Sequence, residues 1–201
     1  KRDLERVPAR PFTGEGDLVM FFPWKASLQR RMDEFSLTPF EQLDVLVAHT
    51  AGKARKVVDT YYALSGHDPE GALAKLWKEM QESFGSGQKV AASLKRKVAS
   101  LPKMKDDAKL GENLKELRKI CYGLAHNLPY VPSLQLLNFS EGQEPIWRKL
   151  PDRFIKRWCK IGAEYENSNG DQHPPFSRFV EFLESLVVEC SSDNFQPSPT
   201  E

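Results

Sequence analysis

Histidine and cysteine are the residues of this sequence best suited to catalysis or metal binding, and both are widely scattered. The histidines form no H-x-x-x-H or H-E-x-x-H pattern, the spacing that places two imidazoles on one helix face. The cysteines form no C-x-x-C pair, the usual beginning of a zinc site. The residues are His49, His67, His126, His173, Cys121, Cys159 and Cys190. The sequence therefore predicts no metal and no cofactor.

Motifs for nucleophilic catalysis and for phosphate binding do not occur in the sequence either. There is no G-x-S-x-G, no G-x-x-x-x-G-K-[ST], no G-x-G-x-x-G and no D-[ST]-G. Phe12 to Gly16 contains glycines but no phosphate-binding pattern. Acids and bases are spread along the predicted helices, as solubility alone requires. We therefore expect a protein that is not an enzyme, and a site assembled from distant residues is the alternative left open.

Length and composition allow a packed core but favour no particular partner. The chain has 201 residues, 40% of them hydrophobic, and a formal net charge of +1. This length fits one large domain or two small ones. A nearly balanced charge gives no whole-chain argument for nucleic acid or membrane, and no apolar run approaches the ~20 residues that span a bilayer. Three dispersed cysteines are typical of reduced thiols, so the expected location is cytoplasmic.

Apolar periodicity and helix start signals predict an all-α fold. The clearest starts are Thr38-Pro39, followed by Glu41, and Asp68-Pro69. Outside the extended lead-in near Pro11, no stretch shows the alternation of a strand. Apolar residues at helical spacing predict segments 23–35, 39–64 with a break at 50–52, 69–84, 90–101, 107–128, 145–150, 151–165 and 174–190.

Two glycines in three residues predict a hinge. Gly85 and Gly87 end the helical segment that starts at Pro69. Such a pair is a common connection between domains. It leaves roughly four helices before the hinge and four or five after it.

A heptad-like seam runs through the segment 107–128. Its apolar residues recur in steps of four and three, as in coiled coils, but over too few heptads to define one. They are Leu110, Leu114, Leu117, Cys121, Leu124 and Leu128. Two interpretations are open: a buried face inside a bundle, or a seam that pairs two molecules.

Charge is distributed unevenly along the chain. Residues 88–119 carry ten Lys/Arg and four Asp/Glu, whereas residues 120–201 carry seven and eleven. The local charges of +6 and −4 fit head-to-tail attraction between copies, an RNA-facing patch, or simply two solvated helix faces. The candidate basic patch consists of Lys95, Arg96, Lys97, Lys103 and Lys105. Because no aromatic residue interrupts Lys95-Arg96-Lys97, base stacking is not indicated there.

Aromatic residues gather near the N-terminus of the sequence. Phe12, Phe21, Phe22 and Trp24 lie within thirteen residues. They form either a groove or anchor for a partner, or the seal of a hydrophobic core.

Several short motifs follow one another in the order seen in the capsid region of retrotransposon Gag proteins. They are Phe12-Thr13-Gly14 with Trp24 and Phe35, Leu43 to Thr50 with Ala51-Gly52-Lys53-Ala54, Pro69 to Met80 with Phe84-Gly85, Ser93-Leu94 to Leu101-Pro102, Leu150-Pro151, and Pro174-Pro175-Phe176-Ser177. From about Pro11 to Leu186, the chain resembles Gag capsid-like domains. The resemblance is greatest to the Gag of BEL/Pao-type LTR elements, and more distant to Ty3-type Gag and the neuronal Arc capsid domain.

The resemblance implies two small helical lobes joined by a short hinge at Gly85 and Gly87. An N-terminal capsid lobe is expected at residues 11–84 and a C-terminal lobe at 85–190, with a flexible lead at 1–10 and a disordered tail at 191–201. The resemblance also implies that copies of the chain assemble into virus-like particles, which enclose RNA and can be released from the cell. The chain contains no C-x-x-C-x-x-x-x-H-x-x-x-x-C knuckle, so the resemblance does not include that RNA-binding module.

Three hypotheses for the function follow. The first is a capsid-type structural protein, either of an active element or of a domesticated copy. The second is a domesticated helical adaptor that binds linear peptides near Phe12 and Trp24, as the related Arc lobe does, without assembling. The third is a nucleic-acid-binding regulator that uses the +6 segment.

Overall fold

A computed structural model describes residues 10–15 and 18–192 of the chain. Its contacts group into two compact units, residues 1–90 and residues 91–201. The described residues are helical apart from loops and one isolated bridge, so the predicted all-α class is confirmed. Except for Arg10, the expected flexible lead lies outside the described residues. The expected tail lies outside them from residue 193, and its first two residues, Ser191 and Ser192, complete the last helix.

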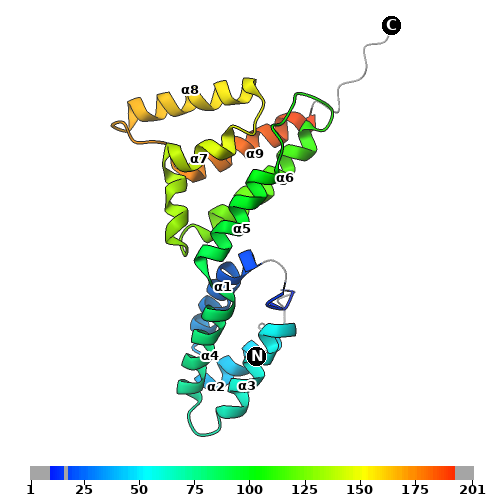
Figure 1. The fold of residues 1–201 in the computed structure, drawn as a ribbon. Coiled ribbons are helices and arrows are strands. Elements are labelled where there is room, and N and C mark those ends of the chain that lie inside the picture. Colours follow the sequence, from blue (N-terminus) through cyan, green and yellow to red (C-terminus); the bar gives the residue numbers. More distant parts are fainter. Residues whose placement is uncertain (1–9, 16–17, 193–201) are drawn as a thin grey trace. The chain divides into compact units, whose positions relative to one another are not determined.

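The described residues of unit 1 form a short 3-10 turn and the helices α1 to α4 (Figure 1). They are η2 (Leu18–Met20), α1 (Phe21–Glu34), α2 (Pro39–Ala48), α3 (Gly52–Leu64) and α4 (Pro69–Phe84). α4 packs against both α2 and α3, and α2 also contacts α3. The apolar faces meet in a core that includes Leu28, Met32, Leu43, Leu46, Val58, Leu76 and Met80.

The helix starts in unit 1 follow the signals in the sequence. The Thr38 hydroxyl accepts from the Glu41 amide, and the Glu41 carboxylate accepts from the Thr38 amide at 2.9 Å, which completes a capping box. Asp68 accepts from the Gly71 amide at 2.8 Å and caps α4. The predicted break after α2 is also present, because Gly52 adopts a φ of +56°. That left-handed conformation is easy for glycine and strained for other residues.

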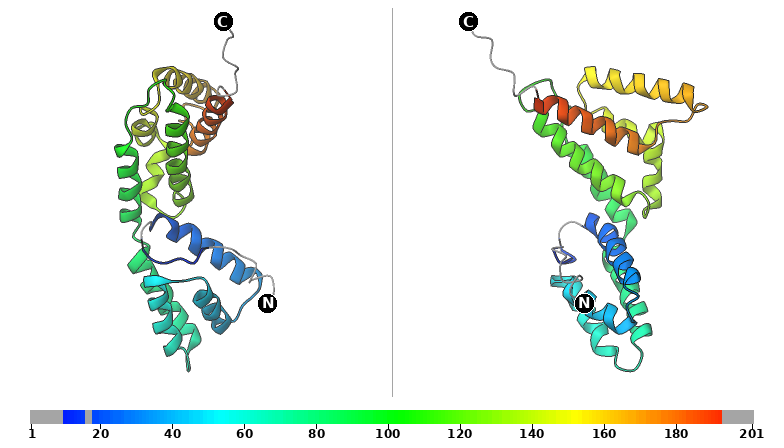
Figure 2. Two further views of the ribbon diagram at one scale, coloured as in Figure 1. Left: turned by 90° about the vertical axis from the view of Figure 1, so that its right-hand side faces the viewer. Right: turned by 180° about the vertical axis from the view of Figure 1, so that it is seen from behind.

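Unit 2 is built on a long pair of helices. Its elements are α5 (Gly87–Ser100), whose first turn precedes the unit boundary, α6 (Leu110–Asn127), η3 (Pro132–Asn138), α7 (Ser140–Trp147), α8 (Asp152–Ser168) and α9 (Phe176–Ser192). α6 lies along α9, and η3 packs on α7 (Figure 2). The heptad-like residues from Leu110 to Leu124 are buried within unit 2. The seam is therefore a bundle face, the first of its two interpretations.

The two glycines of the expected hinge occupy defined positions. Gly85 is the C-cap of α4, and its carbonyl accepts a hydrogen bond from Gln81 Nε2 at 3.0 Å. A Cβ at Gly85 would lie 2.6 Å from Phe21 Cε1, so the residue must be small where α4 passes α1. The Ser86 hydroxyl accepts from the Lys89 amide at 3.4 Å and caps α5, which begins at Gly87.

Candidate protein-interaction sites

The four N-terminal aromatic residues singled out in the sequence lie together in unit 1. The Phe12 ring stacks on Trp24 at a centroid distance of 4.8 Å and contacts Phe21 at 5.6 Å. Phe21 contacts Phe22 edge-on at 5.4 Å. The three phenylalanines are buried and Trp24 is half-buried. This arrangement fits the seal of a core, with Trp24 as its partly exposed member.

Two aromatic residues of α4 complete the cluster. The Phe84 ring meets the Phe12 ring edge-on at a centroid distance of 5.5 Å. The centroids of the Trp77 and Trp24 rings are 6.1 Å apart. Periodicity places both α4 residues on the apolar face of the helix, but the sequence does not indicate that Phe12 is the partner of Phe84 or Trp24 the partner of Trp77. Beside them, Lys25 Nζ lies 5.3 Å from the Trp77 centroid and donates to Gln81 Oε1 at 3.2 Å. Partial burial lowers the pKa of Lys25 from its ordinary value.

The segment around Phe12 (residues 10–15, the Phe12 segment) binds to unit 1 as an extended peptide does. Its backbone forms an isolated parallel bridge with Thr50. The Phe12 amide donates to the His49 carbonyl at 3.0 Å, and the Phe12 carbonyl accepts from the Ala51 amide at 2.9 Å. The Thr13 carbonyl accepts from the Ala54 amide at 3.0 Å. Main-chain bonds and one side chain in a pocket are how extended peptides are generally recognised.

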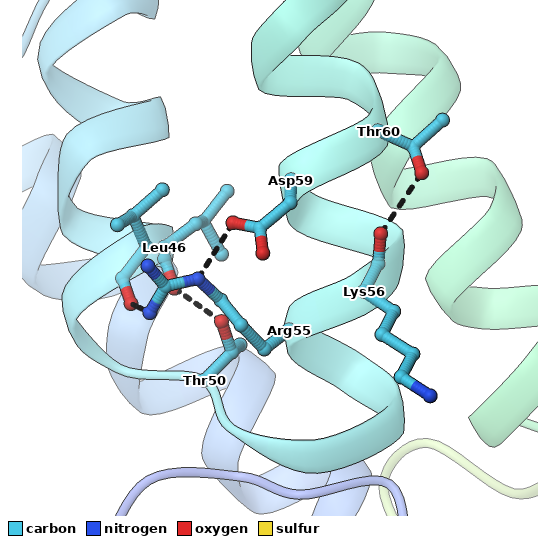
Figure 3. Close-up of polar contacts among 7 residues, drawn as sticks. Leu46, Thr50, Arg55, Lys56, Asp59 and Thr60 are labelled. Atoms are coloured by element: carbon cyan, nitrogen blue, oxygen red, sulfur yellow. Dashed lines mark hydrogen bonds and ion pairs between the residues drawn. The ribbon is translucent and has the colours of Figure 1, made fainter.

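The α2–α3 junction that receives the Phe12 segment is fixed by side chains bonded to backbone (Figure 3). Thr50 Oγ1 donates to the Leu46 carbonyl at 2.7 Å. Arg55 reaches back from α3, and its Nη1 donates to the Val47 carbonyl at 2.7 Å. Its Nε donates to Asp59 Oδ1 at 2.6 Å, which holds the guanidinium in place. Carbonyls at the end of α2, which have no partner within the helix, are thereby satisfied.

Comparison of the chain with family models, with curated proteins and with solved structures finds no match. The Gag-like family therefore remains an expectation from sequence motifs.

The residues of the predicted basic patch lie on α5 and in the loop that follows it, and all five are exposed. Lys95, Arg96 and Lys97 are consecutive on α5, where successive side chains point about 100° apart. Lys103 Nζ is paired with Asp152 Oδ1 at 2.7 Å within unit 2, and this hydrogen bond lowers the pKa of Asp152. Lys105 is exposed in the loop that follows α5. Of these residues, Lys95 borders an apolar hollow.

That hollow, here called the unit-2 groove, is an open apolar depression of about 600 Å³. Lys95 and Lys149 line it together with Glu141, and the Lys149 ammonium also donates to the Leu101 carbonyl at 2.6 Å. The apolar walls come from α5, α6, η3 and α7, and include Val98, Leu124, Leu134, Leu136, Leu137 and Ile146. Its volume falls within the ~300–1,000 Å³ of typical ligand sites.

Close packing of η3 on α7 shapes the groove. A Cβ on Gly142 would overlap the Leu136 carbonyl, so only glycine fits at that contact. The buried Gln143 side chain donates through Nε2 to the Leu137 and Pro174 carbonyls, both at 2.8 Å. Leu136, by contrast, exposes 54% of its surface beside the groove, and Phe139, at the η3–α7 connection, exposes 60%. The sequence gives no sign of this site, because the short elements around Pro145 have no extended periodicity.

A small hollow of unit 2 is lined by a histidine, a glutamate and a cysteine. His173 Nδ1 lies 3.3 Å from Glu166 Oε1, and both line a small hollow with Cys159. Cys121 is fully buried, and burial raises its thiol pKa far above the ordinary value. Within residues 10–15 and 18–192, no three His, Cys, Asp or Glu are grouped to hold a metal ion. Over the same residues, no helix combines the length and apolarity that crossing a membrane requires.

Proposed function

We propose that this protein is a structural, Gag-like capsid protein that self-associates into capsid-like assemblies. The order of the Gag-like motifs supports the proposal, and so does an all-helical chain with two compact units. In this proposal the units are the two capsid lobes, Gly85 and Gly87 form the hinge, and the assembly takes place in the cytoplasm.

The observation that carries the proposal is the apolar surface of unit 2. Leu136 exposes more than half of its surface at an apolar groove of about 600 Å³, and Phe139 exposes more than half of its surface at the nearby η3–α7 connection in the sequence. Contiguous apolar surface of this kind is typical of protein contact sites. Weak contacts of modest size, repeated in many copies, produce stable shells through avidity.

The experiment is light scattering of the purified chain over a wide range of concentration and salt, with electron microscopy of the same samples. We expect the average mass to rise with concentration, and closed or tubular particles to appear. A mass that stays at one chain under every condition, with and without RNA, would overturn the proposal. RNA enclosure is tested in the same series, because binding through lysines and arginines weakens steeply as salt rises.

A second function, peptide binding by an adaptor that does not assemble, is favoured by the Phe12 segment. This segment already occupies unit 1 as a bound peptide would, with an aromatic side chain in a pocket and a bridge to Thr50. Phe12→Ala should vacate the pocket. A synthetic peptide of residues 10–15 should then bind the variant more tightly than it binds the unaltered chain, as isothermal titration can measure. Equal binding to both chains, with the variant shown to be folded by circular dichroism, would exclude the pocket as a peptide site.

A further inference from the structure

The α1–α2 turn of unit 1 is a second exposed apolar feature, far along the sequence from the unit-2 groove. Phe35 follows α1 and exposes 48% of its surface, and Phe40 in the first turn of α2 exposes 46%. Scattered exposed apolar residues are ordinary, but here two phenylalanines lie on one short turn. The α1–α2 turn, residues 33–44, is hereafter called the aromatic tip.

The aromatic tip is held in a defined conformation. The Leu37 amide donates to the Met32 carbonyl at 3.1 Å across the end of α1, and Ser36 takes a left-handed φ of +48°. The Thr38 capping box begins α2, and the Phe40 ring rests on Tyr62 at a centroid distance of 5.7 Å. A preformed tip loses little conformational freedom on binding, which favours its use as an anchor.

Size and charge match the aromatic tip to the unit-2 groove. An apolar cavity of about 150 Å³ holds one benzene ring, and the groove of about 600 Å³ has room for the two rings of Phe35 and Phe40. Residues 33–44 carry four acids and no Lys or Arg: Asp33, Glu34, Glu41 and Asp44. The groove carries Lys95 and Lys149, with Glu141 as its one acid. Opposite charges around an apolar centre orient two surfaces and accelerate their encounter.

We propose that the aromatic tip of one copy docks in the unit-2 groove of a second copy. This inference rests on the proposed self-association and identifies the surfaces that would carry it. The contact joins two different surfaces, so each molecule keeps one tip and one groove for further neighbours. Contacts of this heterologous type generate rings or open filaments, and cannot stop at a symmetric dimer unless the ring closes at two.

The experiment pairs two variants that each lack one surface. Phe35→Ser/Phe40→Ser removes the apolar tip, and Leu136→Asp/Lys95→Glu changes the groove at two exposed positions. Leu64→Ser in unit 1 and Val188→Asp in unit 2 are controls, because both side chains are also exposed. Circular dichroism establishes that each variant is folded, and analytical ultracentrifugation measures association alone and in mixtures.

We expect each surface variant alone to associate at least about tenfold more weakly than the unaltered chain, while both controls associate normally. Mixing the two variants leaves one intact tip and one intact groove, so the mixture should form a 1:1 heterodimer that does not grow further. Glu141→Gln should strengthen assembly, because it removes the acid that faces the acidic tip.

The outcomes separate this inference from the proposed function. If the unaltered chain assembles and both variants assemble equally well, tip–groove docking is overturned and self-association stands. If the variants are weakened but their mixture gives no heterodimer, the two surfaces are not each other's partners. If the unaltered chain is monomeric at every concentration, the proposed function fails, and docking between copies fails with it.

Discussion

The Phe12 ring stacks on the Trp24 indole, with centroids 4.8 Å apart and an interplanar angle of 24°. These residues belong to different segments, so the stack fixes the Phe12 segment onto the first turn of α1. The bridge to Thr50 fixes the same segment to the start of α3. A short extended stretch thereby connects the start of α1 with the start of α3.

Phe12→Ala should destabilise unit 1 strongly. The side chain is only 8% exposed and contacts Phe21, Trp24 and Phe84, so truncation loses burial and leaves a cavity. Changes of this type cost about 3–5 kcal/mol. Urea denaturation followed by circular dichroism measures the loss of unfolding free energy. Phe139→Ala is the matched control, since an exposed phenylalanine should change stability by no more than about 0.5 kcal/mol. Equal losses of unfolding free energy in Phe12→Ala and Phe139→Ala would show that Phe12 is not held in the pocket.

Gly14→Ala should cost more than Gly170→Ala, although both glycines have nearly the same φ. The angles are +69° and +66°, so each alanine carries left-handed strain of about 1–2 kcal/mol. A Cβ on Gly14 would also overlap the Phe84 ring, whereas a Cβ on Gly170 meets nothing within 4 Å. Overpacking adds about 1–3 kcal/mol at Gly14 alone. Thermal unfolding of the two variants compares them directly, and equal shifts in Tm would contradict the close approach of Gly14 to Phe84.

The parts of the fold that the sequence predicts are those governed by local chemistry. Thr38-Pro39 and Asp68-Pro69 specify helix starts through the side chains and backbone of a few neighbouring residues, and both starts are confirmed. The break at Gly52 is likewise local, because one residue takes a left-handed φ. Each of these elements depends on residues within about four positions.

The parts that the sequence does not predict depend on distant pairs. Phe12 and Phe84 are 72 positions apart, and nothing in either segment identifies the other as a partner. The unit-2 groove depends on Gly142 packing against the Leu136 carbonyl and on Gln143 bonding to Pro174. Such contacts between short elements leave no periodic signal, which is why both the full aromatic cluster and the groove come from the structure.

The thiols should differ sharply in reactivity in the folded chain. Cys159 is exposed on α8, whereas Cys121 is fully buried in the α6 face and its pKa is raised by burial. Because the thiolate is the reactive form, a buried and protonated thiol is inert. Brief treatment with iodoacetamide followed by peptide mass spectrometry should label Cys159 and leave Cys121 unmodified until denaturant is added. Early labelling of Cys121 would show that the α6–α9 face opens under native conditions.

Stability should fall at alkaline pH in part because of Tyr122, whose hydroxyl donates to Glu184 Oε1 at 2.5 Å between α6 and α9. This hydrogen bond to a carboxylate raises the pKa of Tyr122 above its ordinary value, because the phenolate could not donate it. Tyrosine in the unfolded chain ionises near pH 10. Above that pH the unfolded state binds fewer protons than the folded state, so the free energy of unfolding decreases as pH rises toward the folded-state pKa.

Below the pKa of tyrosine in the unfolded chain, the Tyr122–Glu184 hydrogen bond makes its full contribution to the free energy of unfolding. Tyr122→Phe should therefore lower stability near neutral pH, and its stability should decline less between pH 9 and 11 than that of the unaltered chain. Tyr130→Phe is a suitable control, because Tyr130 is exposed in the connection to η3. Urea denaturation at a series of pH values measures both curves. Parallel curves for the two variants would mean that the Tyr122–Glu184 bond does not couple stability to alkaline pH.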